Sequence, residues 1–235
     1  PSTLNIWTSN NTNTILEALV NYERTFGSHD FKVLAGTSVE QTSNKGLEGY
    51  RNTFPNNSLY ELGTGDASTA TNNSSLEEYA LVSFFGRVNY AFKDRYLLEA
   101  NLRYDGSSRF AKDNRWGIFP SVSAGWRISE EDFWRNARVG EVFNNLKLRA
   151  SYGVLGNQNI GVYPYQQTYD LGHNYPLGNP AILVPGTYVS TYRNPEITWE
   201  KTAITNVGLD FGLFNNALSG SIEYFYKYTC LLYTS

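Results

Sequence analysis

The sequence predicts an all-β fold, namely an antiparallel, up-and-down sheet of about nine strands that forms a segment of a transmembrane β-barrel. Long stretches alternate apolar and polar residues, and the connections between them alternate short and long. No stretch approaches the ~20 apolar residues of a membrane-spanning helix. A strand with one apolar and one polar face fits a barrel wall, because its apolar face meets lipid and its polar face lines a wet lumen.

The alternation places each strand in turn. In the clearest one, Tyr96, Leu98, Ala100, Leu102 and Tyr104 share one face, and mostly polar or charged residues occupy the positions between them. The same rule predicts strands over residues 4–8, 14–26, 31–40, 79–92, 96–105, 116–128, 146–154, 199–213 and 218–226. We expect the two outer edges of the sheet, near Leu4 and Tyr226, to have no neighbouring strand.

The connections give the sheet a direction. Tight turns are predicted at residues 27–30, 93–94 and 215–216, and long polar loops at residues 44–78, 106–115 and 158–198. An intermediate link, 129–145, lies on the short side, and Ser129 could cap a short helix there. Short turns on one side and long loops on the other are typical of outer-membrane barrels, whose short connections are periplasmic.

Composition excludes several classes of function. Charged residues make up 17% of the chain, the net charge is −3 and there is no basic run, so we expect no nucleic-acid partner. The single cysteine, Cys230, excludes a disulfide framework within the chain and a cysteine zinc site. His29 and His173 lie far apart, and no catalytic triad, nucleophile elbow or calcium-loop spacing is present. We therefore expect no enzyme activity, no cofactor and no metal.

Aromatic residues gather near the ends of the predicted strands. Rings at both ends of an apolar band fit the two membrane interfaces, although aromatic β-propensity alone also enriches strands in rings. The residues concerned are Tyr90, Phe92, Tyr96, Tyr104, Trp116, Trp126, Phe211, Phe214, Tyr224 and Phe225.

The polar faces and loops contain the candidate contact residues. Residues 105–110 read Asp-Gly-Ser-Ser-Arg-Phe, which is either a turn built on Asp105 and Gly106 or a rim that touches a ligand or lid through Arg109. Loop 158–198 is rich in tyrosine, and its rings suit stacking on sugars or gripping a peptide, unless they pack the loop itself. Its candidate contacts are Tyr163, Tyr165, Tyr169 and Tyr175. A lumenal charge network is expected among Arg87, Glu99, Arg103, Lys147 and Arg149.

Ordered motifs between Tyr79 and Tyr226 carry a resemblance. They are residues 85–90 (FGRVNY), 103–110 (RYDGSSRF), 119–129 (FPSVSAGWRIS), 146–153 (LKLRASYG), 156–158 (GNQ), 194–196 (NPE), 199–201 (WEK) and 206–211 (NVGLDF). In this order and spacing the chain resembles the C-terminal barrel of SusC/RagA-type TonB-dependent outer-membrane receptors. The positions matched to family motifs are Asp105, Gly106, Ser107, Ser108, Trp126, Gly153, Asn157, Trp199 and Glu200.

The resemblance implies a 22-stranded barrel in the outer membrane of a Gram-negative, Bacteroidetes-like cell. It implies import of large nutrients, glycans or oligopeptides, with energy from TonB and with a SusD-type lipoprotein as lid. All of residues 1–235 would belong to the barrel. The plug, signal peptide, TonB-contacting segment and terminal strands would lie outside the chain, and residues 230–235 depart from the family pattern and are read as an artefact.

Two alternatives share parts of this pattern. A passive porin-like barrel would show the same alternation and loop asymmetry. A soluble carbohydrate-binding β-sandwich would need its apolar faces to pack on one another.

Overall fold

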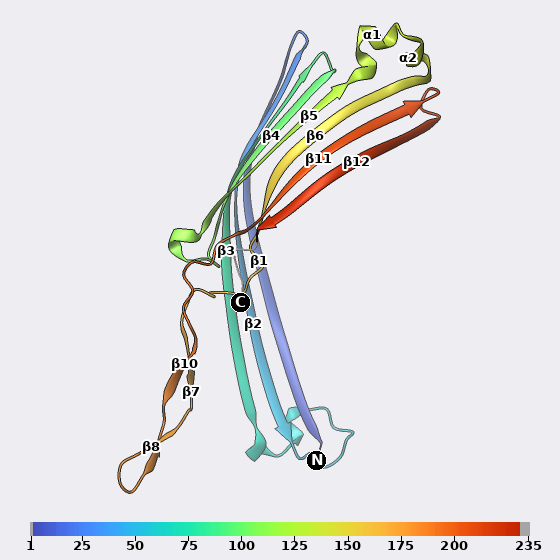
Figure 1. The fold of residues 1–235 in the computed structure, drawn as a ribbon. Helices are drawn as coiled ribbons and strands as arrows, with labels where there is room; N and C mark the ends of the chain where they lie inside the picture. The colour runs from blue at the N-terminus through green and yellow to red at the C-terminus, as the bar shows by residue number, and fades with distance from the viewer. Residues whose placement is uncertain (1, 231–235) are drawn as a thin grey trace. The chain divides into compact units, whose positions relative to one another are not determined.

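The computed structural model describes residues 2–230, and most of them form one eight-stranded antiparallel sheet (Figure 1). Its order is β1-β2-β3-β4-β5-β6-β11-β12, so the strands follow the chain except where the sheet passes from β6 to β11. The bounds are β1 Thr3–Phe26, β2 His29–Asn52, β3 Thr71–Phe92, β4 Tyr96–Ser107, β5 Trp116–Arg127, β6 Phe143–Asn157, β11 Glu200–Leu213 and β12 Leu218–Cys230. This topology confirms the predicted up-and-down sheet, with β1 and β12 at its edges.

Contacts divide the chain into two units. One unit holds the residues up to Leu16 together with Val39–Leu81, and the other holds Glu17–Ser38 and the residues from Val82 onwards. The first unit contains the connection between β2 and β3, with the 3₁₀ turns η1 Leu62–Thr64 and η2 Ala67–Thr69. There the Asp66 carboxylate accepts hydrogen bonds from the Ser68 amide and hydroxyl, both at 2.8 Å, and they lower its pKa. The second unit contains β4 to β12.

The first strands are longer than the sequence predicted. Residues 4–8 and 14–26 belong to one continuous strand, β1, so the sheet has eight strands and not nine. β2 continues to Asn52 and β3 begins at Thr71, which shortens the expected loop 44–78 to residues 53–70. Polar segments lack an apolar alternation, but backbone pairing and polar side-chain contacts extend the strands through them. For example, the Asn13 amide donates to the Glu40 carboxylate at 3.1 Å.

Two of the short connections are tight hairpin turns. Lys93 and Asp94 adopt φ of 52° and 54°, and Asn215 and Asn216 adopt 57° and 62°. Positive φ at both central residues is the geometry of turns that match the twist of paired strands, and Asn and Asp tolerate it better than most residues. Both turns lie where the sequence predicted them.

The link between β5 and β6 is helical. It contains η4 Ile128–Glu130, α1 Asp132–Arg135 and α2 Arg138–Val142. The expectation that Ser129 caps a helix was wrong, because Ser129 lies buried inside η4 and Glu131 occupies the position before α1. The Glu131 carboxylate contacts the sheet, where it accepts hydrogen bonds from the Tyr96 hydroxyl of β4 at 2.6 Å and from the Trp126 indole of β5 at 3.0 Å.

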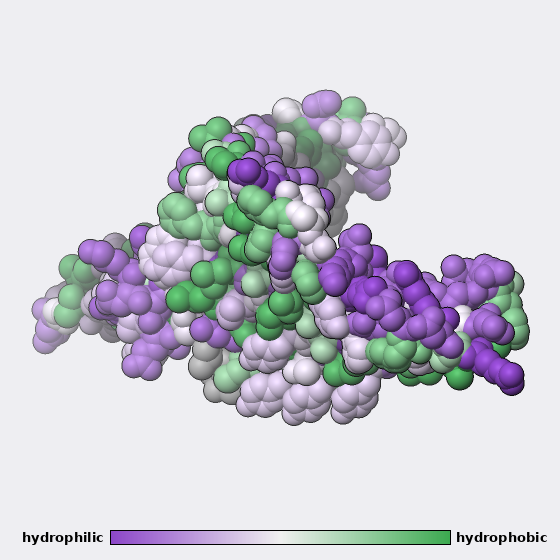
Figure 2. Space-filling model, turned by 90° about the horizontal axis from the view of Figure 1, so that it is seen from above, coloured by the Kyte–Doolittle hydropathy of each residue, from purple (hydrophilic) through white to green (hydrophobic). Residues whose placement is uncertain are grey.

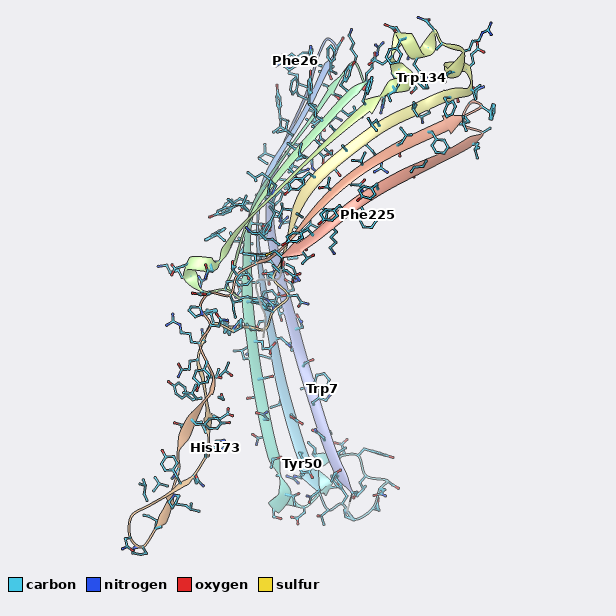
Figure 3. All side chains as sticks on the ribbon, in the orientation of Figure 1. Trp7, Phe26, Tyr50, Trp134, His173 and Phe225 are labelled. Atoms are coloured by element: carbon cyan, nitrogen blue, oxygen red, sulfur yellow. The ribbon has the colours of Figure 1, made fainter. Side chains whose placement is uncertain are left out.

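The connection between β6 and β11 has structure of its own. β7 Thr168–Leu171 pairs with β10 Thr187–Thr191, and β8 Tyr175–Leu177 pairs with β9 Ile182–Val184. These short strands extend the loop as two successive hairpin segments, with His173 between them (Figure 3). The sequence showed no clear alternation here because almost every residue of the four strands is exposed.

Within residues 2–230, no helix has both the length and the apolar character needed to cross a membrane.

Candidate functional site: the two faces and the loop end of the wall

The polar face of the second unit is set by strand register. Glu99 lies opposite Ser123, Ser123 opposite Ser151, and Ser151 opposite Asn206, so one polar row crosses four strands. In the neighbouring row Gly125 lies opposite Arg149, which itself lies opposite Gly208. Two serines lie between Glu99 and Asn206 in the first row, and two glycines flank Arg149 in the second. The long side chains therefore have room to lie across the face.

Within residues 2–230, the five residues of the predicted charge network form no ion pair with one another. Arg87, Glu99, Arg103 and Arg149 bond to other side chains instead. Arg149 contacts Asp210 at 3.2 Å and Glu223 at 2.9 Å. Arg103 donates to Asp105 at 2.9 Å and to the Ser83 hydroxyl at 2.9 Å. Two further contacts join Asn101 to Arg87 at 2.6 Å and to Glu99 at 2.8 Å. Each arginine has a matched partner, so the arrangement orders a wet wall and provides no acid and base poised for catalysis.

A hollow of about 490 Å³ lies on the same face. Its walls contain the cations Lys32, Lys147 and Arg149 beside the carboxylates Asp30 and Glu99. Because both signs of charge line it, the hollow suits a polar surface better than a single small ion. Among residues 2–230 no cluster of three or more His, Cys, Asp or Glu side chains could hold a metal ion.

The opposite face is apolar and exposed, with aromatic rings in contact at both ends. At the short-connection end, Phe92 stacks with Tyr96 at 6.2 Å and packs at a tilt against His29 at 4.8 Å, measured between ring centroids. At the loop end, Trp116 stacks with Tyr104 at 4.6 Å and with Phe84 at 6.2 Å. Exposed Leu98, Leu102, Ile118, Val122, Leu148 and Val207 lie on the strands between them.

The spacing of these two aromatic bands matches a membrane. On β4 the apolar region between the two aromatic bands runs from Tyr96 to Tyr104, and on β5 it runs from Trp116 to Trp126. A rise of about 3.4 Å per residue gives about 27 Å and 34 Å along the strands. With a tilt of about 40°, these lengths correspond to roughly 20–26 Å across the membrane, close to the ~25 Å apolar band of outer-membrane barrels.

The most buried side chains of the second unit gather at the loop end. Phe110 is fully buried, and Ile197, Trp199 and Phe119 are nearly so. The Trp199 ring lies 5.2 Å from Phe110 and 5.1 Å from Phe119, between centroids. We call Phe110, Phe119, Ile197 and Trp199 the rim cluster. It brings loop 108–115 and the last residues of loop 158–199 together on the wall.

Hydrogen bonds close the rim cluster. The Trp199 indole donates to the Arg115 carbonyl at 2.8 Å, and the Thr198 hydroxyl donates to the Asn114 carbonyl at 3.2 Å. The Asn114 side chain donates in return to the Pro195 carbonyl at 2.9 Å. Three bonds between two loops that are distant in sequence fix both loops at their bases.

Residues 105–110 lie in and beside this cluster, with a geometry that differs from the expected turn. Asp105 accepts from Arg103, and the Ser107 hydroxyl, not Asp105, accepts from a following amide, that of Arg109 at 3.2 Å. Gly106 lies in β4 without a positive φ. A Cβ at Gly106 would lie 2.7 Å from the Trp116 ring, so glycine is needed there for close packing.

The other predicted site residues are spread over the wall and loops. Asn157 and Glu200 pair at the base of the long loop, with a side-chain hydrogen bond of 3.2 Å, whereas Trp126 lies at the opposite end of the sheet. Gly153 faces Ser121, and Ser107 is fully buried. Ser108 follows the end of β4 at Ser107.

The candidate contact residues all lie on the long loop or touch it. The Arg109 guanidinium donates to the Ile160 carbonyl. Tyr163 and Tyr165 meet edge to face at 6.4 Å, while Tyr169 and Tyr175 are about half exposed on the hairpin segments.

Sequence reasoning missed the rim cluster as a unit and the contact of Glu131 with Tyr96 and Trp126. Two signals for the rim cluster were present in the sequence. Phe119 is an apolar residue at a polar-face position of β5, and NPEITWE places Ile197 and Trp199 inside polar loop sequence.

The family described as TonB dependent receptor-like, beta-barrel, matches residues 2–229. The chain belongs to this family. It is 37% identical over 218 residues to the TonB-dependent receptor SusC of Bacteroides thetaiotaomicron, covering 89% of this chain and 20% of that protein. It is 34% identical over 217 residues to the TonB-dependent receptor P3 of Formosa agariphila, covering 92% of this chain and 21% of that protein. The solved RagAB peptide transporter superposes with a TM-score of 0.83 at 28% identity, covering 96% of this chain and 24% of the matched chain.

Membership of the family decides several expectations. The resemblance to SusC/RagA-type receptors is confirmed, and with it the location of the chain in the Gram-negative outer membrane. The family consists of transport receptors and not enzymes. The open eight-stranded sheet replaces the β-sandwich alternative. The chain spans about a fifth of the length of these curated relatives.

Proposed function

We propose that this chain is a section of the wall of a longer receptor that imports large nutrients, glycans or oligopeptides, into the periplasm. In this proposal TonB supplies the energy through a segment outside the chain, and a SusD-type lipoprotein covers the extracellular mouth. The observation that carries the proposal is the family match over residues 2–229, together with relatives that include a SusC receptor and a RagAB peptide transporter. A passive porin-like barrel has no such support.

The chain would contribute three surfaces to that receptor. The exposed apolar face between the aromatic bands would lie in lipid, and the polar face with its arginine pairs would line the lumen. The long loops would extend outside the cell. The rim cluster supports this division of labour, because it fixes the loop bases on the wall while the hairpin segments beyond stay exposed.

The hairpin segments are the proposed contact with cargo or lid. Tyr169, Tyr175 and Tyr188 are about half exposed and Tyr192 is almost fully exposed. Amide and carboxylate groups lie next to the rings: the Gln167 amide donates to the Tyr169 hydroxyl at 3.0 Å, and the Tyr188 hydroxyl donates to Asp170 at 3.3 Å. Flat rings beside polar groups suit a sugar ring or a peptide backbone.

The test uses the intact receptor with Tyr169→Ala and Tyr175→Ala combined. Binding and uptake of oligosaccharides and of oligopeptides are measured in parallel, and the cargo class that loses affinity is the one the hairpins contact. Tyr224→Ala on β12 is the matched control, since this tyrosine is also exposed but lies on the apolar face. Equal binding of both cargo classes by all variants would contradict the assigned role of the hairpins.

The boundaries of the chain are part of the proposal. A plug, a signal peptide and terminal strands would belong to the remaining part of the receptor, and β1 and β12 would each gain a neighbour there. The artefact assigned to residues 230–235 lies almost entirely outside the described residues, and Cys230 is the exposed last residue of β12. A longer read of the gene that continues in frame after Ser235 would contradict it.

A further inference from the structure

The helical link between β5 and β6 contains apolar side chains that remain exposed and are not packed against the sheet. Phe133 in α1 is 60% exposed, Val139 in α2 is 51% exposed, and Val142 at its end is 38% exposed. Phe214, in the neighbouring short turn, is 61% exposed. We call Phe133, Val139, Val142 and Phe214 the link patch. A connection in contact with water alone would gain nothing from these residues.

Strand register places the beginning of the link on the outward side of the wall. Tyr96 and Trp126 are register partners and occupy the apolar face together with Leu98 and Ala124. Both donate to the Glu131 carboxylate, at 2.6 Å and 3.0 Å, and Arg95 pairs with it at 3.1 Å. Because α1 begins at Asp132, it starts beside the aromatic band that faces lipid.

The far end of the link is fixed as well. The Phe214 amide donates to the Val142 carbonyl at 3.0 Å, and the Asn144 and Asn215 side chains bond at 2.8 Å. The Trp134 indole donates to the Phe143 carbonyl at 2.9 Å, and Trp134 lies with the helices at the short-connection end (Figure 3). The link is therefore held at both ends, which keeps its apolar side chains in place beside the wall.

We propose that the link patch is an interfacial anchor that inserts into the phospholipid leaflet on the short-connection side of the outer membrane. The link begins next to the aromatic band formed by Phe92, Tyr96 and Trp126, because Glu131 accepts hydrogen bonds from Tyr96 and Trp126. Figure 2, which views the molecule from this end, shows hydrophobic and hydrophilic residues side by side at the surface. Short amphipathic segments with exposed Phe and Val bury their apolar side chains at the boundary between head groups and acyl chains.

The link has four carboxylates and two arginines. Glu131 and Asp132 pair with Arg95, which leaves Arg138 as the cation of the link that can reach a lipid phosphate. Arg138 lies exposed between the two apolar residues Phe133 and Val139 and forms no ion pair with any residue from 2 to 230. Arg135 pairs with Glu130. A long arginine side chain can keep its guanidinium among lipid phosphates while its stem lies along apolar surface. The proposal rests on the outward face lying in the membrane, so its test must check that placement separately.

The experiment places a fluorophore on the intact receptor in nanodiscs of phosphatidylethanolamine and phosphatidylglycerol. Every native cysteine of the receptor is replaced by serine, and single substitutions Phe133→Cys, Leu98→Cys and Asn56→Cys carry the label. We expect lipids with a shallow spin label to quench the fluorophore at position 133, and lipids with a deep spin label to quench it at position 98. The label at position 56, in the exposed connection between β2 and β3, should respond only to aqueous iodide.

The outcomes separate the two premises. Quenching at position 98 combined with full iodide access at position 133 would overturn the anchor while leaving the wall in the membrane. Loss of quenching at both positions would overturn the membrane placement itself. Access to iodide in nanodiscs but protection in intact cells would identify a periplasmic protein as the occupant, and would also overturn the lipid anchor. Phe133→Ser, at a side chain already exposed, should leave thermal stability in detergent unchanged and reduce only the extra stability that the bilayer provides.

Discussion

Trp199 should control whether the long loop is ordered. Its side chain is 3% exposed, lies between Phe110 and Phe119, and donates to the Arg115 carbonyl at 2.8 Å. Truncating a buried tryptophan to alanine costs about 3–5 kcal/mol through lost contacts and the cavity that remains. Trp199→Phe keeps most of the packing and loses the hydrogen bond, at about 1 kcal/mol.

These losses concern a local opening and not the whole barrel. β6 and β11 are paired along their length, and we expect this pairing to persist in either variant. Every 1.4 kcal/mol is tenfold in an equilibrium, so Trp199→Ala should raise the open population of loop 158–199 by about a hundredfold to a few thousandfold. Trp199→Phe should raise it roughly fivefold.

Hydrogen exchange of the intact receptor, read by mass spectrometry, measures this opening directly. Peptides from loops 108–115 and 158–199 should lose protection together, while β4 and β11 keep theirs. Tyr192→Ala is the matched control, because Tyr192 lies in the same loop with 85% of its surface exposed. If the Trp199 and Tyr192 variants exchange at the same rate, the rim cluster does not order the loop.

Two further outcomes follow from single residues. Hydrogen bonds lower the pKa of Asp66 in the folded chain, so the ionised carboxylate stabilises the β2–β3 connection above its ordinary pKa of about 4. That stabilisation is lost as the pH falls through the lowered pKa. Hydrogen exchange of residues 53–70, corrected for the intrinsic rate, should show this loss, and Asp66→Asn should not show it. A Cβ at Gly156 would lie 2.1 Å from the Phe119 ring, so Gly156→Ala should destabilise the loop end by about 1–3 kcal/mol in thermal unfolding. Gly86→Ala is the control, because its Cβ would lie 3.5 Å from the nearest atom and should cause no such loss. Equal melting temperatures of the two variants would contradict this packing.

Alternation predicted the strands where one face is apolar, and it did so because such strands have a two-residue period that sequence shows directly. It located β4 and β5 closely, and it located the turns at Lys93-Asp94 and Asn215-Asn216. It broke β1 into two pieces, since the polar residues from Ser9 to Asn13 pair through their backbone and show no apolar face. Strand pairing between distant segments is not visible in a local pattern.

The candidate site was less predictable for the same reason. Parity predicted that these charged residues share a face, because residues two apart on a strand do so, but it did not predict their partners. The rim cluster joins Phe110 to Trp199 across 89 positions, the difference between their residue numbers, and only the fold brings them together. Gly106 was read as a turn glycine, yet its role is set by the Trp116 ring of the neighbouring strand.

The closed base of the long loop has a consequence for how such receptors diversify. Asn157 and Glu200 are register partners joined by a side-chain hydrogen bond, so the loop leaves and re-enters the wall at a single point. The entropy of closing a loop grows only slowly with its length once its ends are held together. The segment between them can therefore be lengthened, shortened or replaced by the loop of a relative while the strands beneath stay as they are.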